Sequence, residues 1–547
     1  MENNKIVKRL DFLKTDRKNV EQIWDCIRKY IMPMRSDFFS DLRSEGSINW
    51  NQNREVFDST AGDGLETLSS SLHGSLTSPA TKWFELAFRD KELNADDECR
   101  KWLENATHDV YSALQDSNFN LEANETYIDL CGYGNAIMVE EEDEDEEGSV
   151  VFQSSPIQDS YFEEDSRGQV VNFYRVFRWT PAQIYDRFGD EGTPEAIIKK
   201  AKEASNQAAL KQEVVMCVFT RYDKKQNRNA GTVLAPIERP FGKKWILKEG
   251  AILLGEEGGY YEMPAYAIRW RKSAGSQWGF GPSHLALPDV LTANRYVELV
   301  LRSSEKVIDP AIMVTERGLI SDIDLGASGL TVVRDMESMK PFESRARFDV
   351  SSIQLADLRS AVRRIYYVDQ LQMKDSPAMT ATEVQVRYEL MQRLLGPTLG
   401  RLENDFLSPM IQRTFNIRFR AGKLGELPSK LLESGKAAMD IVYTGPLSRA
   451  QKIDQAASIE RWAGSTAQLA EINPEVLDIP DWDEMVRMLG SLLGAPQTLM
   501  RPKAKVTSIR KTRSEMQNKA EQAAVAEAEG NAMEAQGKGQ AALKENQ

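Results

Sequence analysis

The chain has 547 residues and a formal net charge of −14, from 69 Lys and Arg against 83 Asp and Glu. At roughly 150 residues per domain, this length predicts about three to four structural units. The ordinary globular composition excludes a collagen-like, disordered or disulfide-scaffold chain, and the acidic balance argues against a protein that coats nucleic acid with a basic surface.

The cysteines and the N-terminus indicate a reducing compartment. Cys26, Cys99, Cys131 and Cys217 include no C-x-x-C pair, so we expect small buried side chains rather than bridges or zinc ligands. The first 18 residues are charged throughout, and no stretch approaches 18 uninterrupted apolar residues. We therefore expect a cytoplasmic protein without a secretory signal or a membrane-spanning helix.

Helical periodicity dominates the N-terminal third of the chain. Apolar residues recur three or four positions apart over residues 5–31, and helical segments follow at 65–76 and 102–114. This spacing predicts amphipathic helices. Residues 76–86 predict a turn that leads into a short extended segment.

The section 132–275 has the pattern of a β-rich α+β unit. Apolar runs at 136–139 and 150–152 flank eight consecutive acids, Glu140–Glu147. We place these acids at a hairpin tip, where a solvated, self-repelling cluster is favoured over a divalent-cation site.

A second hairpin and a capped helix are predicted next. The hairpin runs from 161–168 into 170–177, and Thr180-Pro181 supplies the cap and first turn of a helix that ends near Gly189. Further strands are predicted at 213–222, 241–255 and 263–270.

Longer helices begin after residue 281. One helix is predicted over 288–307 and ends before Asp309-Pro310, because proline disfavours helix in the residue before it. A small α/β excursion follows, with β-type runs at 311–314 and 330–333. A second helix begins at a Ser351-Ser352 cap, so that two helices bracket the excursion like the legs of a hairpin.

A third long helix follows a break at 374–379. Thr380–Glu383 form a capping box, and apolar residues from Val384 to Phe415 form one stripe. A helix over 381–420 would span roughly 60 Å, with a kink at Gly396-Pro397.

The C-terminal part is predicted to be helical and then polar. After a connector at 422–448, helices over 449–499 are interrupted at Asn473-Pro474 and Ile479-Pro480. Residues 501–519 hold seven Lys and Arg against one Glu, and 520–547 are rich in Ala, Gln, Glu and Gly. We expect such a tail to be helical only where a neighbour packs on it.

The sequence offers no catalytic constellation. It has no P-loop, no H-E-x-x-H motif and no G-x-S-x-G elbow. Gly132-Tyr133-Gly134 and Gly279-Phe280-Gly281 are isolated G-x-G pairs without the third glycine of a dinucleotide site. His284 lies at a predicted helix start, where a structural or surface role is favoured over a catalytic base. No cofactor or metal is expected.

The layout favours a subunit of a ring. Helices that are amphipathic on more than one side can pack against the neighbouring copy and leave one face toward a central channel. Basic residues outnumber acids on helix 351–374 by two: Arg359, Arg363, Arg364 and Lys374 against Asp357 and Asp369. Ordinary surface charge is the default interpretation of any one of them, but a ring would repeat them as positive girdles in a negative tube.

Several segments, in this order along the chain, resemble the portal or head-to-tail connector proteins of short-tailed, podovirus-type bacteriophages. The most specific are Gly279-Phe280-Gly281 ahead of a helix and Met379–Val384 at the start of the long helix. The others are Leu76–Phe84, Tyr161–Gly189 and Pro480–Pro496. The resemblance covers nearly the whole chain.

The resemblance implies an α+β fold of the elongated portal type, with a β-rich wing, two stem helices, a small α/β clip, a long kinked wing helix and a helical crown. The implied segments are a wing at 1–281, stem helices at 282–308 and 351–373, a clip at 309–350, a tunnel loop at 374–380, the long wing helix and connector at 381–445, the crown at 446–500 and a tail at 501–547.

The implied function is structural, with no hydrolysis by the chain itself. Such proteins form a ring, typically a dodecamer, at the portal vertex of the virion between head and tail, after assembly in the host cytoplasm. Double-stranded DNA is packaged and ejected through the ring. The implied partners are the terminase, then the tail adaptor and nozzle proteins, together with the major capsid protein and the scaffold, and no membrane.

The resemblance also implies two sets of site residues. The candidates for the DNA channel and tunnel loop are Arg359, Arg363, Arg364, Lys374 and Ser376. The candidates for docking at the clip are Glu316, Arg317, Asp322, Asp324 and Arg334. The acidic run 140–147 is not a feature of the family, and its role stays open.

Two other classes of protein remain as alternatives. An internal scaffolding or assembly protein would have a long heptad repeat in place of the strand-rich middle. A carboxylate-metal enzyme would show turnover and ion dependence, for which the acidic run is the only lead.

Overall fold

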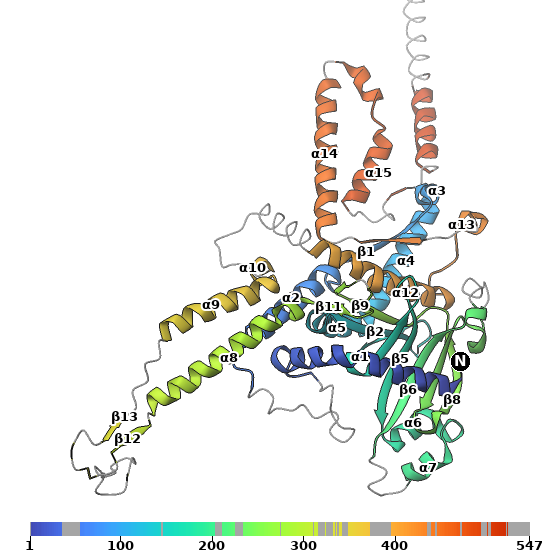
Figure 1. Ribbon diagram of the computed structural model, residues 1–547. Helices are drawn as coiled ribbons and strands as arrows, with labels where there is room; N and C mark the ends of the chain where they lie inside the picture. Colours follow the sequence, from blue (N-terminus) through green and yellow to red (C-terminus); the bar gives the residue numbers. More distant parts are fainter. Residues whose placement is uncertain are drawn as a thin grey trace, which may run out of the picture. The chain divides into compact units, whose positions relative to one another are not determined.

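A computed structural model describes most of the chain. The described residues are 2–35, 55–143, 146–202, 210–224, 234–273, 275–309, 311–315, 323, 332–333, 335, 339–341, 348–371, 395–434, 439–443, 446–470, 473–493, 500–501, 505–520 and 522. Helices and strands are mixed along the chain (Figure 1), so the fold class is α+β, as predicted.

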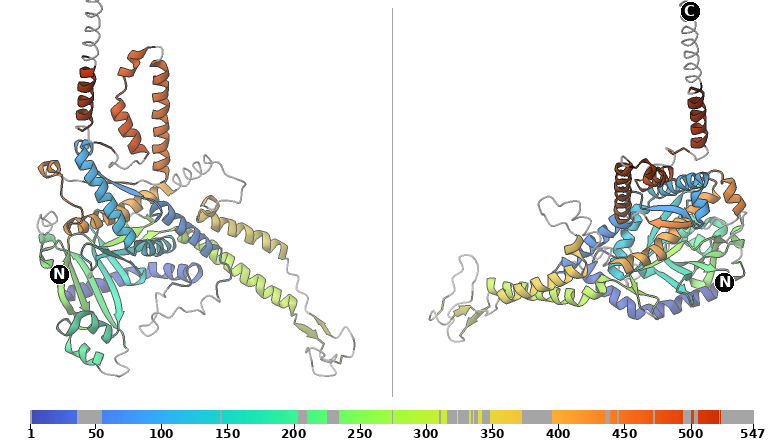
Figure 2. Two further views of the ribbon diagram at one scale, coloured as in Figure 1. Left: turned by 180° about the vertical axis from the view of Figure 1, so that it is seen from behind. Right: turned by 90° about the horizontal axis from the view of Figure 1, so that it is seen from above.

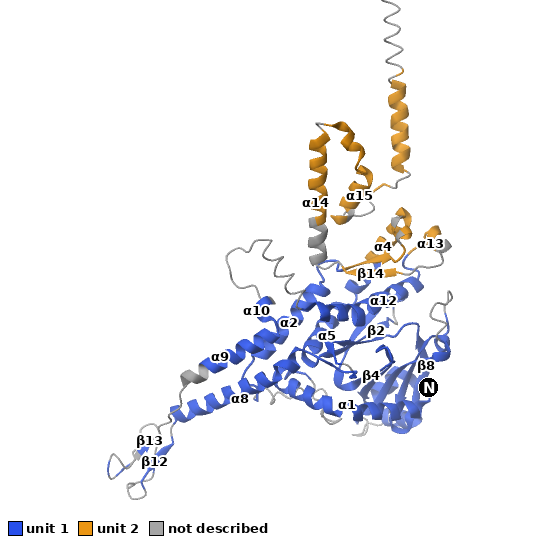
Figure 3. Cartoon of the chain, turned by 45° about the horizontal axis from the view of Figure 1, so that its top comes forward, with its two compact units in different colours: residues 1–83, 109–424 blue, residues 84–108, 425–547 orange. Residues whose placement is uncertain are grey.

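The chain divides into two compact units (Figure 3). The first contains residues 1–83 and 109–424, and the second contains 84–108 and 425–547. The chain therefore leaves the first unit after residue 83, returns to it at 109 and leaves it again after 424.

The N-terminal helices of the first unit follow the predicted periodicity. α1 (Asn3–Ile31) is one continuous helix, and α2 (Thr60–Leu76) covers the helical segment predicted at 65–76. α5 (Phe119–Tyr133) was not predicted. α4 (Asp97–Asp116) begins in the second unit and ends in the first.

α1 covers one face of a five-stranded antiparallel sheet. Its Ile6, Leu10 and Leu13 lie one helical turn apart and join a buried cluster with alternate residues of the strands, among them Tyr174 and Cys217. The sheet order is β4-β5-β6-β7-β8. The strands are β4 (Ser160–Glu164), β5 (Val170–Trp179), β6 (Gln212–Thr220), β7 (Phe241–Leu247) and β8 (Ile252–Tyr260).

In this sheet, one sequence prediction is confirmed and another is wrong. The β4–β5 hairpin and the helix after it are confirmed, because Thr180 and Gln183 form a reciprocal capping box at the start of α6 (Pro181–Gly192). The single strand expected over 241–255 is wrong. It is two strands, β7 and the start of β8, because Gly250 adopts a left-handed φ of 79° in the short turn between them.

A second, three-stranded sheet has the order β3-β2-β9. Its strands are β2 (Asn135–Glu142), β3 (Val150–Ser155) and β9 (Ala265–Arg269). α5 contacts β2 and β3, and η8 (Glu403–Leu407), a π-helical turn, contacts β9. Phe406 of that turn packs against Phe119 and Tyr127 of α5 and Tyr266 of β9.

The predicted pair of helices is present and packs side by side in the views of Figures 1 and 2. α8 (Pro282–Ile308) begins earlier than the helix predicted over 288–307 from the apolar pattern, because Pro282 takes the first helical position that proline favours and Pro288 lies inside the helix. α9 (Phe348–Ile365) also begins ahead of the predicted cap, and it is interrupted at Tyr367, whose φ is 58°, before α10 (Val368–Leu371).

Between these helices, two short strands form an antiparallel pair. β12 (Ile312–Val314) fulfils the prediction of a β-type run at 311–314, and its partner is β13 (Met339–Pro341). The second predicted run, 330–333, lies partly outside the described residues.

The predicted stripe of the third long helix is confirmed where the structure describes it. Leu395, Leu402, Phe406, Met410 and Phe415 are all buried. Residues 395–402 are helical and α12 (Ser408–Arg420) follows, with the π-helical turn between them. The predicted capping box at Thr380–Glu383 lies outside the described residues.

The second unit is mainly helical. β1 (Phe84–Phe88) pairs with β14 (Met439–Tyr443). Its helices include α3 (Lys91–Ala95), α13 (Ser429–Ser434), α14 (Pro446–Ala470), α15 (Trp482–Leu492) and a helix at residues 505–520. The predicted interruption of the helical module is confirmed, because a 3-10 turn, η9 (Pro474–Asp478), separates α14 from α15.

Candidate functional site: the paired helices α8 and α9

The start of α8 is fixed by a backbone crossing between the two G-x-G segments. Gly134 ends α5 with a left-handed φ of 68°, and a Cβ placed on it would lie 2.4 Å from the nitrogen of Gly281. The Asn135 side chain donates to the carbonyl of Gly279 (2.8 Å) and accepts from its N–H (2.7 Å). The two G-x-G segments, Gly132–Gly134 and Gly279–Gly281, therefore pack against each other, and their glycines permit this close approach of the main chains.

The first turn of α8 carries two structural polar side chains. His284 Nδ1 accepts a hydrogen bond from the Gly281 N–H at 3.2 Å, and burial lowers the pKa of His284 to about 4. Ser283 Oγ donates to the carbonyl of Cys131 (2.9 Å) and lies 2.7 Å from the hydroxyl of Tyr366, at the end of α9. The start of α8 and the residue that follows α9 are therefore joined to each other and to the end of α5. His284 has a structural role, as predicted.

A loop ahead of α2 holds α8 and α9 together. The Asn294 side chain on α8 donates to the carbonyl of Glu55 (3.0 Å) and accepts from the N–H of Phe57 (2.6 Å). Asp58 is buried and accepts hydrogen bonds from the Thr60 N–H and from Arg359 Nε on α9, each within 3.0 Å. Although burial opposes ionisation, these two bonds hold the pKa of Asp58 below its ordinary value.

The three arginines predicted for α9 therefore differ. Arg359 is engaged by Asp58 while its side chain stays 45% exposed. Arg363 and Arg364 are exposed and form no ion pair with any residue that the structure describes. Among the described residues of the predicted set, these two differ from Arg359 in having no ion-pair partner there.

The outer half of α8 is not buried, and it carries several exposed large apolar side chains. No residue of the helix beyond Asn294 is buried. The large apolar side chains exposed there are Leu299, Leu301, Val307 and Ile308. Four charged side chains are exposed among them, Arg295, Arg302, Glu305 and Lys306, so apolar and charged groups share this surface.

The remaining predicted site residues lie outside the described residues. Lys374 and Ser376 fall within 372–394, and the five clip candidates, Glu316, Arg317, Asp322, Asp324 and Arg334, fall within the gaps between 315 and 335.

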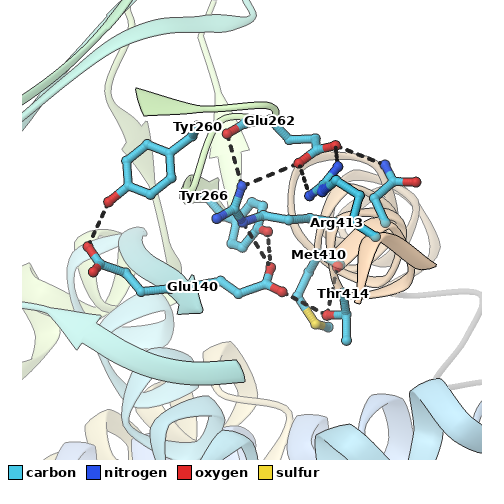
Figure 4. Close-up of polar contacts among 10 residues, drawn as sticks. Glu140, Tyr260, Glu262, Tyr266, Met410, Arg413 and Thr414 are labelled. Carbon is cyan, nitrogen blue, oxygen red and sulfur yellow. Dashed lines mark hydrogen bonds and ion pairs between the residues drawn. The ribbon is translucent and has the colours of Figure 1, made fainter. Parts of the chain in front are cut away.

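A buried polar cluster lies on the three-stranded sheet beside α12 (Figure 4). Glu140, fully buried on β2, accepts hydrogen bonds from Thr414 Oγ1 (2.8 Å) and from the Tyr266 hydroxyl, and its Oε2 lies 3.8 Å from Arg413 Nε. Arg413 also donates to the carbonyl of Glu262 at 3.0 Å. Burial raises the pKa of Glu140 to about 7, with Arg413 opposing the shift.

This cluster corrects the prediction for the acidic run. Glu140 is the last buried residue of β2 rather than part of a solvated tip, and Glu141 pairs with Lys243 (3.0 Å) and the Tyr260 hydroxyl (3.0 Å). The prediction failed because distant cations and hydroxyls compensate these carboxylates, which local charge density does not reveal. Glu142, Asp143, Glu146 and Glu147 are half-buried or exposed, and residues 144–145 lie outside the described part.

A cavity of about 260 Å³ adjoins the cluster. Its lining holds three acids, Glu141, Glu142 and Asp143, and four cations, Arg239, Lys243, Arg413 and Arg420. Among the cations, Lys243 binds Glu141, and Arg420 binds Glu262 at 2.8 and 3.0 Å. The cavity therefore offers balanced charge rather than an excess of one sign.

Other predictions concern metals, cysteines and membranes. Cys99, Cys131 and Cys217 are buried as expected, but Cys26 is exposed on α1, because it lies off the buried stripe. Among the described residues, no three His, Cys, Asp or Glu side chains are grouped to hold a metal ion. In that same part of the chain, no helix has both the length and the apolar character to cross a membrane.

Sequence reasoning missed the residues that anchor the helix pair. Asp58 precedes Ser59-Thr60 at the start of α2, and a capping position of this kind was a detectable signal. Asn294 and Arg413 had no local signal, because each acts on residues far away in the sequence.

The comparisons with known proteins agree with one another. Residues 3–500 match a family described as bacteriophage head to tail connecting protein. The chain is 27% identical over 527 residues to the "Probable portal protein" of Bordetella phage BPP-1, which covers 94% of this chain and 91% of that protein. It is 26% identical over 541 residues to the "Portal protein" of Salmonella phage epsilon15, with 96% and 94% covered. The chain therefore belongs to the bacteriophage head-to-tail connecting proteins.

Proposed function

We propose that copies of this chain form a ring at one vertex of the phage head, and that double-stranded DNA is packaged and ejected through it. The observation that carries the proposal is the helix pair α8 and α9, where the outer half of α8 exposes four large apolar side chains, Leu299, Leu301, Val307 and Ile308, on more than one side of the helix. Such a surface is stable in water when neighbouring copies cover it, and a closed ring gives every copy the same cover.

In this proposal α8 and α9 are the stem helices, and Arg363 and Arg364 line the channel. Their exposed guanidinium groups can contact phosphates transiently, whereas the net charge of −14 limits lasting attachment of the duplex. Arg359 contributes mainly by holding α9 to Asp58. Lys374 and Ser376 remain candidates for the closest contact.

The partners follow from the same proposal. The clip at 309–350 docks the terminase and later the tail adaptor and nozzle proteins, through Glu316, Arg317, Asp322, Asp324 and Arg334. The wing (1–281) and crown (446–500) meet the capsid protein and the scaffold. Twelve copies form the ring, at the portal vertex of a virion assembled in the host cytoplasm.

The assembly step is tested by placing charge on the exposed apolar side chains in the outer half of α8. Leu299→Glu together with Leu301→Glu should convert rings into monomers in negative-stain images and native mass spectra, because each carboxylate would be buried between copies. Leu121→Glu, at a side chain that is 75% exposed on α5, is the matched control and should leave rings intact. Rings that survive the double substitution would refute the stem assignment.

The channel role is tested separately. Arg363→Gln with Arg364→Gln should leave ring formation unchanged and reduce the amount of DNA that heads package or retain. Unchanged DNA content in heads that carry this variant would count against these two residues as channel contacts.

A further inference from the structure

The helix at residues 505–520 is the most basic element of the described chain (red in Figure 1). It holds five cationic residues and one acid, Glu515, for a net charge of +4 in a chain whose total is −14. The cations are Lys505, Arg510, Lys511, Arg513 and Lys519, and all five are exposed. A concentration of charge opposite to the chain's own sign needs a reason other than solubility.

Only one of the five cations has an internal partner in the described residues. Arg510 binds Asp483, in the first turn of α15, through two hydrogen bonds of 2.5 and 2.6 Å. This pair joins the basic helix to the rest of the second unit. The other four cations form no ion pair with any described residue and are therefore available to an external anion.

The helix lacks the surface that a protein partner would need. Its large apolar side chains are three, the half-buried Val506 and Ile509 and the 67% exposed Met516, and Arg513 interrupts the face that they share. Protein interfaces are centred on apolar or aromatic anchors and are depleted of charge at their core. Lysine and arginine on several sides of a polar helix instead suit a polyanion that is read through its charge.

We propose that helix 505–520 is a sequence-independent binding site for the phosphate backbone of nucleic acid, and that duplex DNA is its occupant. The choice of duplex DNA rests on the proposed function. The four free cations each neutralise one phosphate, while Arg510 keeps the helix attached through Asp483. Because salt screens the remaining acidic chain beyond about 8 to 10 Å, the exposed helix acts locally despite the overall charge.

The test measures how salt changes the affinity of the full-length protein for a 30-base-pair duplex. Each phosphate contact contributes about 0.9 to the slope of log K against log salt concentration, so four contacts give up to about 3.6 per chain. Between 50 and 200 mM salt, that slope corresponds to a loss of affinity on the order of 100-fold. The variant K505Q/K511Q/R513Q/K519Q should lose this part of the slope and bind at least tenfold more weakly at 50 mM salt.

A matched control separates the helix from the total charge. K8Q/K18Q/K101Q/K199Q removes four positive charges from exposed lysines on α1, α4 and α7 (Glu195–Lys202) and should leave the slope unchanged. Glutamine keeps the helix propensity of lysine in both variants, and circular dichroism checks that both stay folded. An equal loss of slope in the control would overturn the assignment to this helix.

Two further ligands define what is recognised. A duplex of scrambled sequence should bind with the same slope, and a strong sequence preference would overturn backbone recognition. Poly-glutamate of matched charge should bind more weakly than the duplex. If poly-glutamate bound as tightly and the duplex slope did not respond to the fourfold variant, the occupant would be an acidic protein and the proposal would be wrong.

The outcome is distinguishable from that of the proposed function. Negative-stain images of the fourfold variant should still show rings, because none of the four cations forms an ion pair with the part of the chain that the structure describes. If the wild-type chain forms no rings but loses its slope in the variant, the ring proposal fails and the binding site stands. If rings form but the variant keeps the wild-type slope, the ring proposal stands and the binding site on helix 505–520 is wrong.

Discussion

Arg413 and Arg363 have the same side chain but opposite surroundings. Arg413 is 2% exposed and lies between Glu140 and Glu262, which it joins to α12. Arg363 is exposed on α9 and has no ion-pair partner in the described chain. The first arginine is committed to the fold, and the second is free for a partner. The difference separates charges that hold the molecule together from charges that serve its surface.

The largest loss of stability should come from a substitution where the main chains of Gly134 and Gly281 cross, because no side-chain atom fits between them. Gly134→Ala would place a Cβ 2.4 Å from the Gly281 nitrogen at a left-handed φ, and we expect a loss of about 4 kcal/mol in the free energy of unfolding. Urea denaturation of soluble protein measures it. Gly74→Ala, in α2 with nothing within 4 Å of the new Cβ, is the control and should be neutral or stabilising.

The next effect tests the interior charge directly. Arg413→Met keeps an unbranched side chain but removes the cation, which leaves the buried Glu140 with only the hydroxyls of Thr414 and Tyr266 as described partners. Because Glu262 keeps its bonds to Arg420, we expect a loss of about 3 kcal/mol, at the lower end for breaking a buried pair. Arg363→Met should change the denaturation midpoint little. Equal losses of stability in Arg413→Met and Arg363→Met would contradict the distinction between the buried arginine and the exposed one.

A pH dependence should accompany the buried cluster. Burial raises the pKa of Glu140 from 4.5 to about 7, so the folded state binds more protons than the unfolded state between these values. Stability should therefore fall as pH rises from 4.5 to 7, by up to about 3 kcal/mol from this group.

Glu140→Gln isolates that contribution. Burial also raises the pKa of Asp129 to about 6, with the same sign, so the informative quantity is the difference between wild type and variant. The variant should lose part of the fall in stability across pH 4.5 to 7. Parallel stability curves for the two proteins would show that Glu140 keeps its ordinary titration.

The smallest effect sharpens the comparison within one helix. Arg359→Gln should lower the free energy of unfolding by about 1 kcal/mol, because the buried Asp58 carboxylate loses its ion pair with Arg359. Arg363→Gln, one turn further along α9, should change stability by less than about 0.5 kcal/mol. Thermal unfolding of the two variants side by side measures the difference, and a larger loss for Arg363 would reverse the assignment of roles.

The sequence predicted those features that depend on local periodicity. The stripe through Leu402, Phe406 and Met410 is buried as expected, because its spacing alone requires one apolar face. The paired helices α8 and α9 were also predictable. The start of α8 was not, since Pro288 resembles a helix start as much as Pro282 does, and only the contact with Gly134 selects between them.

The sequence could not predict features that depend on partners far along the chain. Glu140 was expected in a solvated tip, but its compensating groups lie on β9 and α12. Arg359 and Arg363 are equivalent in the sequence, and only the position of Asp58 distinguishes them. Long-range compensation of charge leaves no periodic or local signal, so candidate site residues were harder to assign than the elements that carry them.

The crossing of Gly134 and Gly281 also has a mechanical consequence. The contact is made by main-chain atoms, which cannot change rotamer to absorb a displacement as side chains do. A load applied along α8 would therefore pass into the end of α5 and the first residues of β2 with little give. The joint at the root of the helix acts as a stiff coupling, and bending of α8 is left to positions beyond the joint, such as Pro288 inside the helix.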